Sequence, residues 1–174
     1  MKTNPLKRLI IRPRAIRENK ICPPDKVRTL YTIGYEGVTA EALCRSLKDA
    51  GVKLLIDVRA VPLSRKPGLS KNKLATKLAE NGIQYLGLKG LGTPAEGREA
   101  ARKGRTAEMR RIFYTYLETE DAQRDMHVAI KAARQQISCL LCFEHAPQSC
   151  HRLMVAEKMS EQENFGIVHL NPAI

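Results

Sequence analysis

The chain of 174 residues is poor in aromatic side chains, with no tryptophan, three phenylalanines and five tyrosines. Proteins that bind single-stranded nucleic acid commonly stack bases on aromatic rings, so this composition disfavours a long base-stacking surface. The sequence also lacks any run near the roughly 20 apolar residues that a transmembrane helix needs. Its N-terminus has no apolar region typical of a secretory signal. We therefore expect a cytoplasmic protein that does not enter a membrane.

Cysteine is scarce as well. The five cysteines are an odd number, which does not fit a disulfide framework in an intracellular chain: Cys22, Cys44, Cys139, Cys142 and Cys150. We expect them to be reduced thiols.

Acidic residues are few compared with basic ones, and the net charge is +12. Residues 1–28 hold nine Lys or Arg against Glu18 and Asp25, a net charge of +7. This basic N-terminal extension could contact phosphate groups, because each neutralised phosphate releases counterions, or it could be a solvated tail. The remaining residues, 29–174, have the length and apolar content of one compact domain.

Five short apolar runs predict strands, at 30–34, 52–58, 83–86, 137–143 and 166–170. Apolar residues at helical spacing between them predict helices at 39–50, 71–80, 106–117, 119–136 and 150–161. Continuous apolar strands alternating with helices indicate a mostly parallel sheet covered on both faces. The predicted fold is an α/β open three-layer sandwich with about five strands.

In such sheets ligands bind beyond the carboxyl ends of the strands, so polar residues there are site candidates. Asp57 and Arg59 are two apart on a strand and share a face, as do Cys142 and Glu144. The expected ligand-binding residues are Gly34, Tyr35, Glu36, Arg59, Ser64, Arg65, Tyr85, Cys142, His151 and Arg152. Structural alternatives remain open: Asp57 and Arg59 as an ion pair that only stabilises the fold, and the tyrosines as lids on the core.

Cys150 precedes His151 and Arg152 at the expected start of the last helix. Ser149 is a good N-cap, which would place all three in the first turn, near unpaired N–H groups. The helix dipole and the adjacent guanidinium would lower the pKa of the thiol. We therefore predict Cys150 as a catalytic nucleophile, with Asp57 or Glu144 as acid or base. The same helix start could instead bind a phosphate, or hold a quietly packed cysteine.

A zinc site is the weaker interpretation of the same stretch. Cys139 and Cys142 are three apart, so on a strand their side chains point to opposite faces and cannot share one ion. A site from Cys142, His145, Cys150 and His151 is geometrically conceivable. We expect no metal and no cofactor.

Six blocks of residues, taken together, resemble one family: Thr32-Ile33-Gly34-Tyr35; Leu55 to Arg59 with Pro62, Ser64 and Arg65; Gly82-Ile83 with Tyr85; Leu91-Gly92; Leu141-Cys142 with Glu144; and Cys150-His151-Arg152. In this order they resemble the domain-of-unknown-function family DUF488 over about residues 30–170. One departure is Leu69, where many members carry phenylalanine. The resemblance implies a cytoplasmic α/β protein and no settled chemistry. The Asp57-Val58-Arg59 element also looks like the opening of rhodanese domains, but Cys150 is not placed as a rhodanese cysteine would be.

Two basic segments, 59–77 and 98–111, follow predicted strand ends and could form a rim around the cleft. A basic rim suits a phosphorylated ligand, so we expect a nucleotide or nucleic acid as partner. The leading hypothesis is a cleft that binds a phosphate-bearing ligand, with or without catalysis. The alternatives are a non-catalytic nucleic-acid-binding module that uses the basic extension and the rim, and a structural zinc domain.

Overall fold

The computed structural model describes residues 27–172, which contain a five-stranded parallel sheet. Its strands are β1 (Arg28–Gly34), β2 (Leu54–Asp57), β3 (Gln84–Gly87), β4 (Ser138–Cys142) and β5 (Phe165–Leu170), in the order β3-β2-β4-β1-β5. Each strand begins and ends within two residues of its prediction. The predicted fold class is confirmed.

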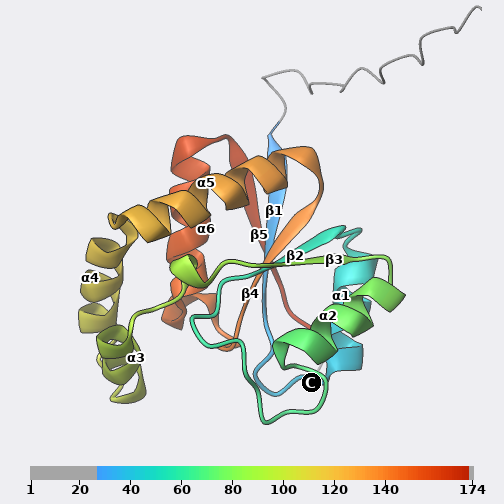
Figure 1. The fold of residues 1–174 in the computed structure, drawn as a ribbon, viewed down its shortest axis with the longest axis horizontal. Helices are drawn as coiled ribbons and strands as arrows, with labels where there is room; N and C mark the ends of the chain where they lie inside the picture. Colours follow the sequence, from blue (N-terminus) through green and yellow to red (C-terminus); the bar gives the residue numbers. More distant parts are fainter. Residues whose placement is uncertain (1–26, 173–174) are drawn as a thin grey trace, which may run out of the picture.

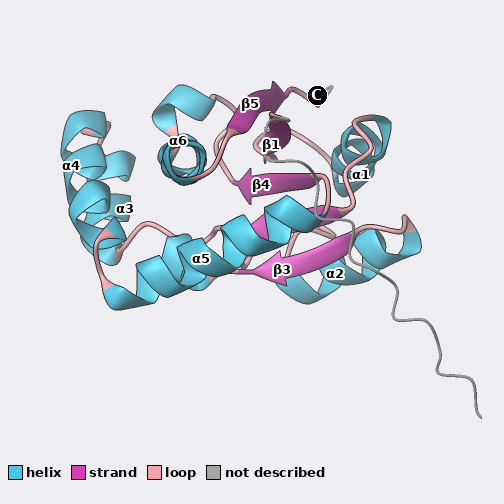
Figure 2. Ribbon diagram, turned by 90° about the horizontal axis from the view of Figure 1, so that it is seen from above, coloured by secondary structure: helices cyan, strands magenta, loops and turns pink. Residues whose placement is uncertain are grey.

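The described residues also form six α-helices that pack around the sheet: α1 (Ala40–Asp49), α2 (Lys71–Glu80), α3 (Ala95–Arg102), α4 (Thr106–Leu117), α5 (Glu120–Gln135) and α6 (His151–Gln162). Helices α1 and α2 cover one face, and α5 and α6 cover the other, with α3 and α4 beyond α6 (Figures 1 and 2). The sequence did not predict α3, because only Gly97 and Ala100 of this short helix are buried and the apolar period is weak.

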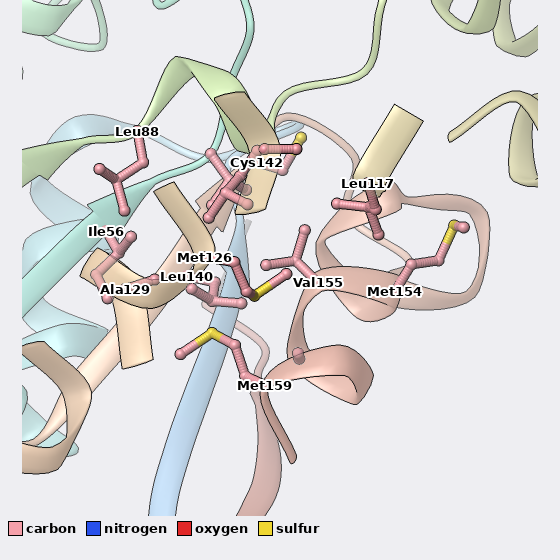
Figure 3. Close-up of a cluster of buried hydrophobic side chains, with 14 of the residues drawn as sticks. Ile56, Leu88, Leu117, Met126, Ala129, Leu140, Cys142, Met154, Val155 and Met159 are labelled. Atoms are coloured by element: carbon pink, nitrogen blue, oxygen red, sulfur yellow. The ribbon is translucent and has the colours of Figure 1, made fainter. Parts of the chain in front are cut away.

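Strand side chains alternate between two apolar cores. Leu54, Ile56 and Leu140 face the core under α4, α5 and α6, where the methionines of α5 and α6 also pack (Figure 3). Leu55, Cys139 and Leu141 face the core under α1 and α2. Cys139 and Cys142 therefore belong to opposite faces, as the spacing predicted.

Threonine side chains cap the starts of two helices, α1 and α5. The Oγ1 atoms of Thr39 and Thr119 accept hydrogen bonds from the backbone N–H of Ala42 and Ala122. The predicted cap at Ser149 is wrong, because that residue ends a short 3₁₀ turn, η2 (Pro147–Ser149). Cys150 is itself the N-cap of α6, and its Sγ accepts from the N–H of Arg152 at 3.5 Å.

The chain leaves neighbouring strands toward opposite faces of the sheet. After β2 it runs to α2 on one face, and after β3 it runs through the 3₁₀ turn η1 (Lys89–Leu91) toward α3, α4 and α5 on the other. Such divergence opens a crevice at the carboxyl ends of parallel strands. The fold thus places a ligand-sized opening beside β2 and β3.

Within residues 27–172, no helix combines the length and apolar character needed to cross a membrane. The predicted basic extension falls outside the described residues except for Val27 and Arg28, and Arg28 is the first residue of β1.

Candidate functional site

A pocket of about 250 Å³ opens at the carboxyl ends of β2 and β3. Its lining is Asp57, Arg59, Pro62, Lys71, Tyr85, Gly87, Lys89 and Asp125. Three of these, Asp57, Arg59 and Tyr85, are among the residues expected from the sequence. The pocket combines strand ends, the start of α2, the turn η1 and the middle of α5.

Asp57 and Arg59 form a buried ion pair at the base of this pocket, with side chains only 1% and 5% exposed. Arg59 donates from Nε to Asp57 Oδ1 at 2.8 Å and from Nη2 to Oδ2 at 2.6 Å. Its Nη1 donates to the hydroxyl of Tyr35 and to the carbonyl oxygen of Leu69, both at 3.0 Å. Four of the five N–H groups of this guanidinium are thus engaged, so Arg59 chiefly shapes the pocket and keeps one Nη2 N–H without a partner among the described residues.

Two tyrosines contact this ion pair at the base of the pocket. The Tyr35 ring lies under the Arg59 guanidinium, 5.1 Å from its central carbon, which adds a cation–π contact. The Tyr85 hydroxyl donates to Asp57 Oδ2 at 2.6 Å. Burial raises the pKa of Tyr85, and its hydrogen bond to the carboxylate raises it further. Burial opposes the charge of Arg59, but the contacts with Asp57 outweigh it and raise the pKa of the guanidinium.

Lys71 belongs to the basic segment 59–77 that the sequence predicted as a rim, whereas Lys89 and Asp125 of the pocket were not predicted. Lys71 is the first residue of α2, and Lys89 opens η1. Asp125 on α5 accepts from the backbone N–H of Gly90 at 2.8 Å and so ties α5 to η1. Lys89 follows a strand end and could have been found by that rule, whereas Asp125 comes from mid-helix and carries no such signal.

A second polar group lies at the end of β4, on the α6 side of the sheet. The donor atoms of Cys142, Glu144, Cys150 and His151 all lie within 4.8 Å of one another. Cys142 and Cys150 donate to Glu144 Oε2 at 3.2 Å and 2.9 Å. His151 Nδ1 is 3.6 Å from Cys142 Sγ, and its Nε2 donates to the carbonyl oxygen of Val58 at 2.9 Å. We call these four residues the thiol cluster.

The thiol cluster does not have the electrostatics expected from the sequence. Burial raises the pKa of Cys150, whose side chain is 2% exposed, instead of the expected lowering. Burial alone would raise the pKa of Glu144, but hydrogen bonds from the two thiols outweigh the effect of burial, so the pKa of Glu144 is lowered. Burial alone would lower the pKa of His151, but the contact of the ring with Cys150 outweighs the effect of burial, so the pKa of His151 is raised.

Arg152 is only 1% exposed, does not line the pocket, and contacts the chain that follows β4. Its two Nη atoms donate to the carbonyl oxygens of Glu144 and His145. The guanidinium therefore clamps this loop. Its Nε is buried and has no hydrogen-bond partner among the described residues, and the expected anion contact by Arg152 stays a prediction.

The other expected residues hold loops at the same sheet edge. Glu36 accepts from the backbone N–H of His145 at 3.0 Å. Gly34 allows Glu144 to pass closely, since a Cβ there would stand 1.9 Å from the Glu144 carbonyl oxygen. Ser64 accepts from Lys66 and bonds through its backbone to Ser70, and Arg65 is exposed beside it. None of these residues lines the pocket.

The family model for "Domain of unknown function DUF488" matches residues 39–159. The chain belongs to this family. The match spans α1 to α6 and so includes the pocket and the thiol cluster. Comparison with the curated proteins and with the solved structures gave no significant match. The resemblance expected from the six sequence blocks is thus confirmed, and the family's description names no function.

Proposed function

We propose that this DUF488 protein binds a phosphate-bearing ligand, a nucleotide that is free or at the end of a nucleic-acid strand, in the pocket beyond β2 and β3. The observation that carries the proposal is that Lys71 and Lys89 reach one pocket from two different elements. The ion pair of Asp57 and Arg59 is internally neutral, so the two ammonium groups outweigh the single remaining carboxylate, Asp125. The pocket attracts an anion.

The start of α2 adds backbone donors to this attraction. Ser70 precedes the helix in an extended conformation, but its hydroxyl donates to the carbonyl oxygen of Ser64 and accepts from that residue's N–H. It does not cap the helix. The N–H of Lys71 donates to the carbonyl oxygen of Pro62 at 3.0 Å, so the N–H groups of Asn72 and Lys73 are the first-turn donors left for a ligand. Unpaired N–H groups at a helix start favour phosphate oxygens.

Apolar surface beside the pocket supports a nucleotide over inorganic phosphate. Pro62 lines the pocket, and its neighbours Val61 and Leu63 are 51% and 73% exposed. These apolar side chains offer a surface on which a base or sugar can pack. The volume of about 250 Å³ is slightly below the usual range for small-molecule sites, which fits one nucleotide unit and no larger ligand.

The contacts favour binding over the catalysis that the sequence also predicted. Both carboxylate oxygens of Asp57 already accept hydrogen bonds, four in all, from Arg59 and Tyr85. Cys150 is buried outside the pocket lining. The alternative, a module that binds nucleic acid through residues 1–28 and the exposed basic rim, makes a different prediction about the pocket lysines.

The test is a titration of the full chain with inorganic phosphate, adenosine monophosphate and a short single strand carrying a 5′-phosphate. Because a hydrogen bond to a charged group contributes about 1.5–3 kcal/mol, Lys71→Ala and Lys89→Ala should each weaken nucleotide binding by about tenfold or more. Lys48→Ala makes the same charge change in the last turn of α1, at the opposite edge of the sheet.

Three results would overturn the proposal: no binding of any of these ligands, equal weakening by all three lysine substitutions, or strand binding that neither pocket substitution alters. The last result would support the alternative module. Tighter binding of adenosine monophosphate than of inorganic phosphate is expected if the apolar surface contributes, and the single strand shows whether the nucleotide is recognised as a strand end.

A further inference from the structure

We propose that the thiol cluster is a structural zinc site, with Cys142 Sγ, Cys150 Sγ, Glu144 Oε2 and His151 Nδ1 as its four ligands. The four donor atoms converge from three places: the last residue of β4, the loop that follows it, and the first turn of α6. This site is separate from the nucleotide pocket, since none of its four ligands lines that pocket.

The separations between donor atoms suit one tetrahedral ion. Zinc–ligand bonds of about 2.0–2.3 Å place neighbouring donors of a tetrahedral ion about 3.3–3.8 Å apart. Cys142 Sγ lies 3.6 Å from His151 Nδ1 and 3.2 Å from Glu144 Oε2, and all four donor atoms lie within 4.8 Å. Side-chain shifts of about 1 Å or less would complete the tetrahedron.

The second nitrogen of His151 supplies an independent observation. A carbonyl oxygen can only accept, so the 2.9 Å contact with Val58 places the ring hydrogen on Nε2. In the neutral ring, Nδ1 then carries a lone pair, and it is the nitrogen nearer to Cys142 Sγ, at 3.6 Å against 3.9 Å for Nε2. Histidines that bind zinc usually donate their other N–H to a carbonyl or carboxylate in this way, which fixes the ring and its tautomer.

Charge balance points the same way. Two thiolates and one carboxylate around Zn²⁺ leave a formal charge of −1. Arg152 is almost fully buried and forms no ion pair among residues 27–172, although buried guanidinium groups are costly without compensation. The guanidinium of Arg152 donates to the carbonyl oxygens of Glu144 and His145, and the backbone N–H of Arg152 donates to Cys150 Sγ. The cation and the anionic centre would neutralise one another.

Burial makes the site structural in kind. Cys142, Cys150 and His151 are buried, and four protein ligands leave no open position for substrate, as in structural zinc sites. Binding releases the two thiol protons to solvent, so the affinity for zinc falls as the pH is lowered. The ion would join β4 to α6, and through Val58 to the end of β2.

The zinc site that was conceivable from the sequence contained three of these ligands, with His145 as the fourth. The structure offers Glu144 instead, because the carboxylate of Glu144 contacts both thiols. Sequence spacing alone could not distinguish the two neighbouring residues.

The experiment is metal analysis of the full chain, produced under reducing conditions without a histidine tag or chelator. We expect about one zinc per chain. The double substitution Cys142→Ala with Cys150→Ala should remove it to background, whereas Cys44→Ala and Cys139→Ala, also at buried cysteines, should retain it. The two control cysteines lie in the other core.

A measurement on the unaltered chain does not depend on how the variants fold. Replacing the ion with Co²⁺ should give the strong visible bands of a tetrahedral ion and a thiolate charge-transfer band. The proposal is overturned if zinc stays at background after incubation with Zn²⁺, if Co²⁺ gives only weak octahedral bands, or if zinc content is equal in the double variant and the unaltered chain. A Cys142–Cys150 disulfide as the main state of the reduced preparation would also overturn it.

Discussion

His151 Nε2 lies 2.9 Å from the carbonyl oxygen of Val58, which joins the first turn of α6 to the end of β2. Val58 stands between Asp57 and Arg59, the ion pair at the base of the pocket. The pocket and the thiol cluster therefore depend on the same three residues of chain. Changes to this segment should be costly, and the ion pair is the first to test.

Asp57→Asn should lower the free energy of unfolding by about 3–5 kcal/mol, the usual cost of breaking one partner of a buried ion pair. The substitution leaves the buried Arg59 charge without its counter-charge. Urea unfolding followed by circular dichroism measures the change. The matched control is Asp121→Asn, whose ion pair with Arg124 is exposed and should contribute about 0.5 kcal/mol or less. Equal effects of the two substitutions would contradict the role given to Asp57.

Tyr85→Phe should reveal the raised pKa of Tyr85 through stability at high pH. Up to about pH 10 the hydroxyl keeps its proton in both states, and the hydrogen bond to Asp57 makes the unaltered chain more stable by about 1.5–3 kcal/mol. As the pH rises further, the unfolded chain loses this proton first, because the folded-state pKa is higher.

The stability of the unaltered chain should therefore fall more steeply above about pH 10 than that of Tyr85→Phe, and the difference between them should shrink. Urea midpoints of both proteins at several pH values from neutral to alkaline measure it. A difference that stays constant or widens with pH would contradict the raised pKa.

Gly34→Ala should destabilise the fold, because the new Cβ would stand 1.9 Å from the Glu144 carbonyl oxygen. Backbone atoms cannot rotate away, so we expect at least the about 1–3 kcal/mol typical of overpacked sites. Gly166→Ala is the control, since its Cβ would meet only the Val27 side chain, at 3.2 Å. If thermal unfolding shows the two alanines to be equally tolerated, the close approach of Gly34 to Glu144 is wrong.

The sequence predicted the fold well because its signals are local. Continuous apolar runs predicted each strand, and Thr39 and Thr119 marked helix starts that the structure confirms. The strand order β3-β2-β4-β1-β5 was not predicted, since it depends on which runs meet after folding. Residues 57 and 59 were correctly placed on one face, because two-residue spacing suffices for that.

The site was predicted only in part, since side-chain partners come from distant segments. Arg59 was expected to bind an anion, but Asp57, Tyr35 and the Leu69 carbonyl engage four of its five N–H groups. The thiol of Cys150 was expected to be activated by its helix start, but burial has the opposite effect. Asp125 enters the pocket through the packing of α5 against η1, which no local pattern encodes, whereas the position of Lys89 after a strand end could have been recognised.

The most direct test of nucleotide binding is chemical-shift mapping of the backbone amides during titration with adenosine monophosphate. The largest chemical-shift changes should fall at the start of α2, from Lys71 onward, and between Tyr85 and Lys89 around the pocket. Amides near Lys48, at the opposite edge of the sheet, should stay unchanged. Absence of changes at millimolar nucleotide, or changes centred away from α2 and β3, would contradict it.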